Sequence, residues 1–418
     1  MWISPLARSG NAAPQCQERS LPDHVETAAV HAGKLVTPLN AASSPPLFQA
    51  SSYEFTDLED VEAIYGGSRE GAIYGRYGGP NGAQFERAVA ALEGAEAAAG
   101  AAAGVAAIHA ALSTSLPAGS ALLATRELYG GTFALLENDY RKAGVLVEYV
   151  DQGDLAAVET ALGRLRPRVL YVEALTNPLM NVADLPALAR LAHTAGALLI
   201  VDATFATPVL CRPIEHGADL VAHSAGKYFG GHGDVGAGVV AGRRDAIEAI
   251  RAHLVRTGAT IPHFEAWLAL RGLRTLALRM ERHSDNALAV ARYLQTVDAV
   301  AAVHHPSARE TPQRELAGRL YPRGCGGIVA FDLPGGHPAV DAFLRGLETI
   351  AIVHSLGEVA TTISYPAVSS HRPLTAEARH ALGVGEGTLR LSVGIEHQGD
   401  IIADLGRAFA GLPARLRA

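Results

Sequence analysis

Short apolar runs alternate with amphipathic stretches through the middle of the chain. The apolar runs predict β-strands at residues 121–125, 145–150, 169–173, 197–201 and 220–222. Between them, apolar side chains at helical spacing predict helices at residues 132–142, 154–165 and 184–195. Strands that alternate with helices predict an α/β fold, in which a mostly parallel sheet is covered by helices on both faces.

The pattern differs on either side of this segment. Before it, prolines interrupt residues 23–55, which are therefore predicted to form a loop. The spacing of apolar residues predicts a helix at 82–93. The alanine-rich stretch 95–113 permits a helix to start at Gly104. After Gly238, helices are predicted at 243–253, 262–296 (interrupted near Gly272), 338–346 and 400–410, with strands at 326–332 and 388–393. We therefore expect four segments: a disordered tail at 1–22, an N-terminal arm at 23–80, a large domain at 81–264 and a smaller α+β domain at 265–418.

The composition narrows the class of protein. The chain has 418 residues, enough for two domains, and no apolar run approaches the roughly 18 residues of a membrane span. Its net charge of −7 argues against a nucleic-acid or anionic-membrane partner. Cys16, Cys211 and Cys325 are too scattered for a disulfide framework or a metal cluster. Because residues 1–21 lack the apolar core of a signal peptide, we expect a cytoplasmic enzyme.

The candidate chemistry lies at the ends of two predicted strands. The run 197–201 ends at Asp202, and the run 220–222 is followed by Ser224, Lys227 and a glycine-rich loop. In a parallel sheet these strand ends meet at one edge, where a cofactor such as pyridoxal phosphate (PLP) could bind. Lys227 could form a Schiff base with the PLP aldehyde, Asp202 could face the pyridine nitrogen, and Ser224 could bind the phosphate.

The two alternatives to a PLP site are a lysine in a surface loop and a P-loop. A lysine in a surface loop would have no reason to stand between an apolar run and glycines that permit close backbone approach. A P-loop would need glycine at position 221 and serine or threonine at position 228, where the chain has Val221 and Tyr228. Elsewhere, a helix starting at Gly104 could bind phosphate with its free N–H groups, and Arg76, between Tyr74 and Tyr77, suits anion binding.

Motifs along nearly the whole chain, about residues 31–409, carry a family resemblance. In order, these are Tyr74-Gly75-Arg76, Gly104-Val105, Leu128-Tyr129-Gly130-Gly131-Thr132, Glu173, Asn177-Pro178, Asp202-Ala203-Thr204, Ser224-Ala225-Gly226-Lys227, 273–283, Ser355-Leu356-Gly357 and Leu389-Arg390-Leu391. The chain resembles the Cys/Met metabolism family of PLP-dependent enzymes, the cystathionine γ-synthase, cystathionine γ-lyase and methionine γ-lyase group. The resemblance implies the aspartate-aminotransferase fold (fold type I).

The resemblance also implies a role for individual residues. Lys227 would bind PLP covalently and then move protons on the substrate, and Tyr129 would stack on the cofactor ring and act as a general acid or base. The remaining cofactor-binding residues would be Asp202, Thr204, Ser224, Gly104 and Val105, joined by Tyr74 and Arg76 from the arm of a neighbouring subunit in a homotetramer. The substrate-binding residues would be Arg390, which would bind the carboxylate, and Ser355, Asn177 and His354.

Four positions depart from the family pattern. Gly226 stands where relatives usually have a phosphate-binding threonine, and Gly131 stands where methionine lyases have a cysteine. His354 replaces a glutamate of cystathionine enzymes, and Glu358 replaces a small residue. Because histidine offers no fixed anion near pH 7, His354 argues against a substrate with a second ammonium group.

These observations predict an enzyme that eliminates or replaces a group at Cγ of a sulfur-containing or O-activated amino acid. We favour a carbon–sulfur lyase, and the alternative is a γ-replacement transferase of the cystathionine γ-synthase or O-acylhomoserine sulfhydrylase type. A non-catalytic binding protein is the rival from another class, and the intact set of Lys227, Asp202, Tyr129 and Arg390 argues against it. The expected partner is a small amino-acid substrate.

Overall fold

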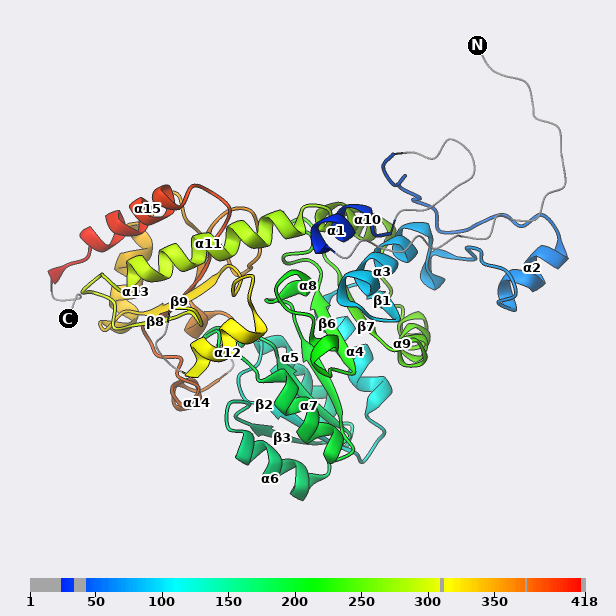
Figure 1. The fold of residues 1–418 in the computed structure, drawn as a ribbon, viewed down its shortest axis with the longest axis horizontal. Helices are drawn as coiled ribbons and strands as arrows, with labels where there is room; N and C mark the ends of the chain where they lie inside the picture. Colours follow the sequence, from blue (N-terminus) through cyan, green and yellow to red (C-terminus); the bar gives the residue numbers. More distant parts are fainter. Residues whose placement is uncertain (1–23, 34–42, 309–311, 373, 415–418) are drawn as a thin grey trace, which may run out of the picture.

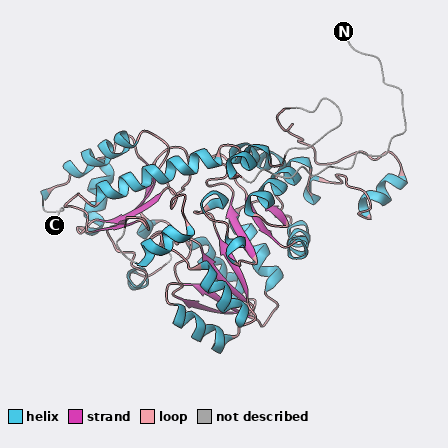
Figure 2. Cartoon of the chain, in the orientation of Figure 1, coloured by secondary structure: helices cyan, strands magenta, loops and turns pink. Residues whose placement is uncertain are grey.

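The computed structural model of the chain describes residues 24–33, 43–308, 312–372 and 374–414 (Figure 1). The tail expected at 1–22 therefore lies outside the described residues. Two β-sheets form the centres of the molecule, and the helix α11 (Leu276–Leu294) extends from one toward the other (Figure 1). Helices surround the strands of both sheets (Figure 2).

The larger sheet has seven strands in the order β1-β7-β6-β5-β4-β2-β3. Their bounds are β1 (Ala97–Ala101), β2 (Ala121–Thr125), β3 (Leu146–Val150), β4 (Val169–Glu173), β5 (Leu198–Asp202), β6 (Leu220–Ser224) and β7 (Gly238–Gly242). The neighbours from β6 to β3 are parallel, whereas β7 is antiparallel to both β1 and β6. The mostly parallel sheet predicted from the apolar runs is confirmed.

Helices cover both faces of this sheet because its central strands are apolar on both sides. Along β4, Leu170 and Val172 belong to one buried cluster, and Val169 and Tyr171 belong to the cluster on the opposite face. The covering helices are α3 (Pro80–Glu93), α4 (Gly104–Ser115), α5 (Gly130–Leu135), α6 (Leu155–Leu165), α7 (Leu185–Thr194), α8 (Thr207–Leu210), α9 (Arg244–Thr257) and α10 (His263–Leu273).

Local signals account for several helix ends. Asp154 and Asp184 cap α6 and α7 by accepting hydrogen bonds from the backbone N–H groups three residues later. The helix predicted at 132–142 is divided into α5 and a π-turn at Leu136–Tyr140. The long helix predicted at 262–296 is interrupted near Gly272, as expected, and forms α10 and α11.

The second sheet has five strands in the order β10-β11-β12-β9-β8. Their bounds are β8 (Ala302–His304), β9 (Ile328–Asp332), β10 (Ala351–Ile352), β11 (Thr362–Ser364) and β12 (Thr388–Ser392), and the accompanying helices are α12 (Pro312–Leu320), α13 (Gly336–Arg345), α14 (Ala376–Ala381) and α15 (Gln398–Ala410). Its core includes Phe331, Phe343 and Phe409, whose ring centroids lie 4.7 to 6.1 Å apart. This mixture of strands and helices after residue 300 agrees with the α+β pattern of the sequence.

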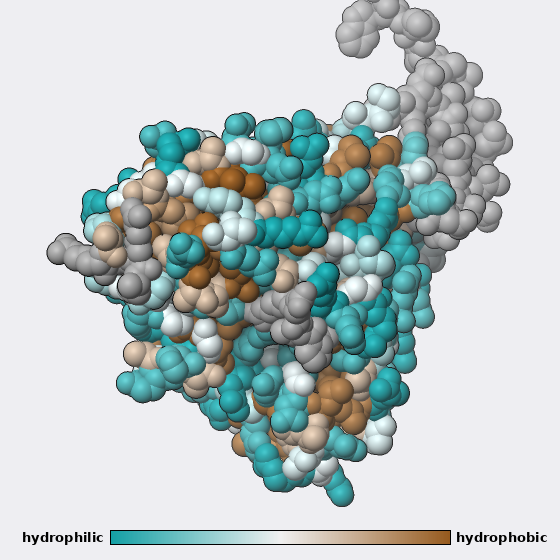
Figure 3. Space-filling view, turned by 60° about the vertical axis from the view of Figure 1, so that its left-hand side comes forward, coloured by the Kyte–Doolittle hydropathy of each residue, from teal (hydrophilic) through white to brown (hydrophobic). Residues whose placement is uncertain are grey.

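The N-terminal segment contains more regular structure than its prolines suggest. Residues expected to be loop form α1 (Val25–His31), which contacts α3 and α11, and α2 (Leu58–Tyr65) follows. Residues 43–74, which lead to a short 3-10 turn at Gly75–Tyr77, extend away from the large sheet (Figure 1). Among the described residues, no helix is long and apolar enough to cross a membrane, and on the face in Figure 3 the apolar patches are interrupted by polar residues.

Candidate active site

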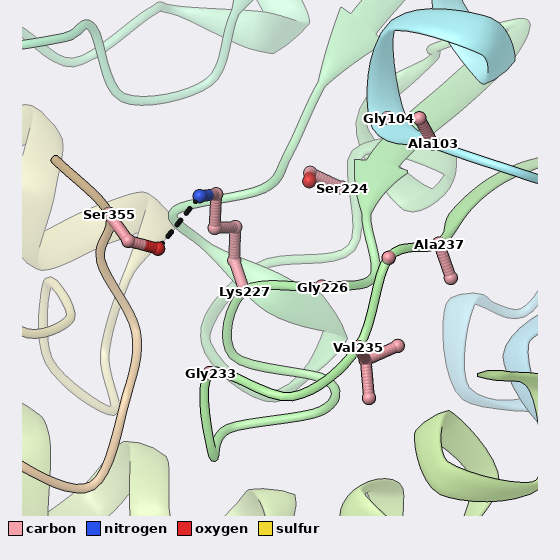
Figure 4. Close-up of a pocket in the computed structure, with 10 residues that line it drawn as sticks. Ala103, Gly104, Ser224, Gly226, Lys227, Gly233, Val235, Ala237 and Ser355 are labelled. Atoms are coloured by element: carbon pink, nitrogen blue, oxygen red, sulfur yellow. Dashed lines mark hydrogen bonds between the residues drawn. The ribbon is translucent and has the colours of Figure 1, made fainter.

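A pocket of about 170 Å³ opens where β6 ends. Beyond β6, the chain turns through Gly226 and Lys227, passes through the glycine-rich loop 230–236 and returns as β7. The Lys227 side chain points across the pocket, and its Nζ donates a 3.0 Å hydrogen bond to Ser355 Oγ (Figure 4). A lysine from the large sheet thus meets a serine from the segment between β10 and β11.

The environment of Lys227 makes its amine easier to deprotonate. Burial and the nearby positive charge of Arg390 lower the pKa of Lys227 below its ordinary value, and the negative charge of Glu358 opposes this shift. Since only the neutral amine is a nucleophile, a lowered pKa favours attack on an aldehyde. The geometry therefore suits the Schiff-base chemistry expected of Lys227.

Two carboxylates lie side by side at the same edge of the sheet. Asp202 ends β5, Glu173 ends β4, and the two residues are paired in register. Asp202 Oδ1 accepts a 2.9 Å hydrogen bond from the Thr204 N–H. Burial raises the pKa of Asp202, and burial together with the charge of Asp202 raises the pKa of Glu173 well above its ordinary value. A cation at this edge would stabilise the charged forms of both groups, which fits a protonated pyridine nitrogen.

Glu173 also holds two neighbouring segments in place. Its Oε1 accepts a 2.6 Å hydrogen bond from the Tyr129 N–H, and its Oε2 accepts a 3.1 Å hydrogen bond from the Asn177 N–H. The sequence indicates no role for Glu173 beyond that of a motif residue. A charged residue at the carboxyl end of a fully buried strand was the available signal, because such a group requires partners.

The opposite end of the pocket has the features of a phosphate site. The first N–H groups of α4, which begins at Gly104, have no partner within the helix, and Ser224 lies beside them. A Cβ at position 104 would lie 2.7 Å from Ser224 Cβ, so this close approach requires glycine. Thr204 Oγ1 accepts a 2.9 Å hydrogen bond from the Ser224 N–H and connects the two strand ends. Val105 is half-buried in the first turn of α4.

Gly226 makes an equally close contact on the other side of the pocket. A Cβ at this position would lie 2.3 Å from the carbonyl oxygen of Val235. The backbone of the glycine-rich loop thus occupies the space that a threonine side chain would fill. The pocket thus contains the Lys227 amine and the start of α4, and Asp202 ends the strand that pairs with β6. An amine, a helix N-terminus and a nearby anion are the groups that PLP requires.

Arg390 is the candidate for binding the substrate carboxylate. It lies on β12, and its guanidinium donates to Asn177 Oδ1 at 2.9 Å and to the Ser355 carbonyl oxygen at 3.0 Å. Burial lowers the pKa of Arg390 to about 10, so the group stays charged near pH 7. Its buried Nε has no hydrogen-bond partner among the described residues, which leaves a donor for a substrate carboxylate.

The structure places the other predicted site residues less centrally. Tyr129 directly precedes α5 and is 44% exposed, and His354 is exposed next to Ser355. Arg76 donates a 2.8 Å hydrogen bond to the carbonyl oxygen of Val255 in α9, and Tyr74 is 46% exposed. Neither Tyr74 nor Arg76 lines the Lys227 pocket of its own chain.

An amine, a strand-end anion and a helix N-terminus at the carboxyl edge of this sheet define a class of protein, the PLP-dependent enzymes of fold type I. The family model described as Cys/Met metabolism PLP-dependent enzyme matches residues 26–410. The chain belongs to this family. The family resemblance, the fold and the cofactor expected from the sequence are thereby confirmed.

Relatives within the family carry out both types of reaction considered above. The chain is 39% identical over 387 residues to O-succinylhomoserine sulfhydrylase of Pseudomonas aeruginosa, covering 93% of this chain and 95% of that protein. It is 40% identical over 382 residues to L-methionine γ-lyase of Porphyromonas gingivalis, covering 91% of this chain and 95% of that protein. The structure of cystathionine γ-synthase from Xanthomonas oryzae pv. oryzae with aminoacrylate and cysteine is similar at a TM-score of 0.88 and 35% identity, covering 94% of this chain and 100% of that one.

Proposed function

We propose that the enzyme cleaves the carbon–sulfur bond at Cγ of a sulfur-containing amino acid. The observation that carries this proposal is the position of the Lys227 amine between the Asp202 edge of the large sheet and the Arg390 guanidinium of the second sheet. The second candidate is a γ-replacement reaction on an O-activated homoserine. It is supported because the chain is almost equally identical in sequence to a sulfhydrylase and to a methionine γ-lyase.

Each residue has a task that its surroundings explain. Bound PLP supplies an electron-withdrawing ring that stabilises negative charge on the substrate. Arg390 holds the substrate carboxylate, which keeps Cα facing the Lys227 amine. Lys227 Nζ, oriented by Ser355 Oγ, removes the Cα proton. The second deprotonation, at Cβ, and departure of the γ group are the steps that elimination and replacement share.

We assign to Tyr129 the protonation of the leaving sulfur. Its backbone N–H is fixed by Glu173 at 2.6 Å, while its ring projects from the start of α5 into accessible space. An exposed phenol can exchange its proton with solvent between turnovers. The buried carboxylate thus orients the residue without contacting the leaving group.

The proposal includes an assembly in which the arm completes a neighbouring site. Tyr74 and Arg76 lie outside the pocket of their own chain, and the arm exposes further apolar side chains that a second copy could cover. These exposed side chains are Leu47, Phe48, Leu58, Tyr65 and Tyr77. We propose that the protein is a cytoplasmic homotetramer built from two catalytic dimers. In each subunit, residues 81–264 form the domain that binds PLP.

Product analysis distinguishes the two candidate functions. PLP-loaded enzyme is incubated with methionine, cystathionine, homocysteine and O-acylated homoserines, each with and without an added thiol. A lyase releases 2-oxobutanoate, ammonia and a thiol from a sulfur substrate without any added thiol. A replacement enzyme yields a new thioether from an O-acylhomoserine only when a thiol is present. No product from any of these amino acids would refute both candidates.

A further inference from the structure

A buried histidine and a buried glutamate form a pair behind the edge of the large sheet. His223 lies on β6, Glu93 is the last residue of α3, and both are almost completely buried. His223 Nε2 lies 2.7 Å from Glu93 Oε1. The other polar atoms of the pair, His223 Nδ1 and Glu93 Oε2, have no hydrogen-bond partner within the described part of the chain. Neither residue lines the Lys227 pocket.

This pair is unfavourable for stability. Buried charged groups lose the stabilisation that water provides, and two polar atoms of the pair remain unpaired. A carboxylate at the C-terminus of a helix also lies at the negative end of the helix dipole. An apolar pair of similar size would avoid these costs. The position of Glu93 is explained if His223 must carry a positive charge, because a carboxylate at hydrogen-bond distance stabilises an imidazolium.

Two hydrogen bonds fix His223 relative to Asp202. The Ser224 N–H, directly after His223, donates to Thr204 Oγ1 at 2.9 Å, and the Thr204 N–H donates to Asp202 Oδ1 at 2.9 Å. Asp202 pairs in register with Ala222 on the neighbouring parallel strand, so the two backbones are about 5 Å apart. His223 therefore lies directly beside the strand end that carries Asp202.

The side chains of the two residues lie on opposite faces of the sheet. Tyr171 Oη is 3.5 Å from Asp202 Oδ2 on one face, and the centroids of the His223 and Phe229 rings are 4.7 Å apart on the other. Burial raises the pKa of Asp202, and hydrogen bonds from Thr204 and then the charge of His223 oppose this shift. The charge of His223 thus acts on Asp202 through the sheet, without contact between the side chains.

The other ionisable groups around these residues supply no positive charge. Glu173 on β4 and Tyr171 lie on the Asp202 side, and the Cys211 thiol lies on the Glu93 side. Of the described residues with the largest effect on Asp202, only His223 contributes a positive charge.

We propose that His223 is a positioning residue that, paired with Glu93, keeps Asp202 ionised for the pyridine nitrogen of PLP from the opposite face of the sheet. The inference rests on the role proposed for Asp202. It concerns PLP binding, so it applies to elimination and replacement alike.

The test measures the affinity of apo-protein for PLP by visible absorbance at a series of pH values. His223→Gln removes the charge and keeps an N–H donor for Glu93, and Glu93→Gln removes the carboxylate. Asp202→Asn identifies the part of the pH dependence that belongs to Asp202. The matched control is His193→Gln, because His193 forms a 2.9 Å pair with Asp219 at the amino end of β6, the opposite edge of the sheet.

As the pH falls, the wild-type protein should lose PLP affinity when Asp202 becomes protonated. His223→Gln should shift the midpoint of this loss upward by about half a pH unit or more, because removal of a nearby positive charge raises the pKa of Asp202. Glu93→Gln should shift the midpoint in the same direction, and His193→Gln should leave it unchanged. Asp202→Asn should bind PLP weakly and lack the transition.

An unchanged midpoint in folded His223→Gln, or a loss of affinity that is equal at every pH, would show that His223 only packs and would overturn the proposal. If His223→Gln does not fold, as judged by circular dichroism, the same two results for Glu93→Gln overturn it. A shift in His223→Gln without one in Glu93→Gln would refute the part that concerns Glu93. Wild-type affinity and pH dependence in Asp202→Asn would instead refute the role of Asp202 itself, so the two failures are distinguishable.

Discussion

The contact between Gly226 and the Val235 carbonyl predicts a specific defect in cofactor binding. Relatives usually have a threonine at this position, so Gly226→Thr would be expected to add a phosphate contact if side-chain identity alone mattered. The structure indicates the opposite, because a Cβ at position 226 would lie 2.3 Å from the carbonyl oxygen. Both Gly226→Ala and Gly226→Thr should therefore weaken PLP binding.

The size of the effect follows from how far the loop must move. Non-bonded heavy atoms are most stable at about 3.5 Å or more, so the glycine-rich loop would have to shift by about 1 Å. Overpacking of this kind costs about 1–3 kcal/mol. The same loop contributes Gly233, Val235 and Gly236 to the pocket wall. The strain therefore destabilises the loop conformation that binds PLP. At about 1.4 kcal/mol per tenfold, the apparent Kd for PLP should rise by about 5-fold to about 140-fold.

The assay is a PLP titration of apo-protein followed by visible absorbance. Gly163→Ala is the matched control, because Gly163 lies in α6 and a Cβ there would have no neighbour within 4 Å. That variant should bind PLP like the wild type and be slightly more stable, since alanine favours helix. Unchanged PLP affinity in Gly226→Ala would refute the reasoning, and tighter binding in Gly226→Thr would show that the loop yields to a side chain.

Three further predictions concern residues of the site. Lys227→Ala should fold, as judged by circular dichroism, but should lack the visible absorbance band that borohydride removes from the wild-type holoenzyme, and normal turnover would contradict its role. Arg76→Ala should lose PLP more readily, and mixing it with Lys227→Ala should restore some activity, because a mixed oligomer contains sites with neither change. Verified mixed oligomers without activity would count against a contribution between subunits. Glu173→Ala should lower kcat/KM by about tenfold or more, because the N–H groups of Tyr129 and Asn177 lose their acceptor. Glu173→Gln should retain part of the activity, and Glu159→Gln, an exposed change on α6, should not alter kcat/KM.

The parts of the structure that could be predicted depend on local sequence. Apolar runs predict β2 to β6. The residues that follow these runs predict Lys227, Asp202 and Ser224 as site residues, because strand ends in a parallel sheet meet at one edge. The strand β1, Ala97–Ala101, could not be recognised in this way. Alanine favours helix, and β1 is a strand because its residues pair with β7, which is far away in the sequence.

Other features of the site depend on contacts that no local pattern reveals. Glu173 was visible as a strand-end carboxylate, but its two N–H partners come from separate loops. The orientation of Glu358 toward Gly233 arises only when the segment 355–359 packs across the loop 230–236. Similarly, the loss of space at Gly226 depends on the path of the backbone around Val235. Sequence patterns identified these positions as unusual, whereas packing explains their consequences.

The arrangement separates the chemistry of the reaction from the choice of substrate. The turn after Lys227 is held by Arg279 of α11, whose buried guanidinium donates to the carbonyl oxygens of Tyr228 at 2.6 Å and Gly272 at 2.7 Å. This anchoring fixes the turn that carries the amine at the sheet edge. The segment 354–362, in contrast, contributes Ser355 beside Arg390 and contains two of the four departures from the family pattern, His354 and Glu358. Because the roles proposed for Lys227, Asp202 and Tyr129 are common to elimination and replacement, the difference between the two reactions should be sought in that segment.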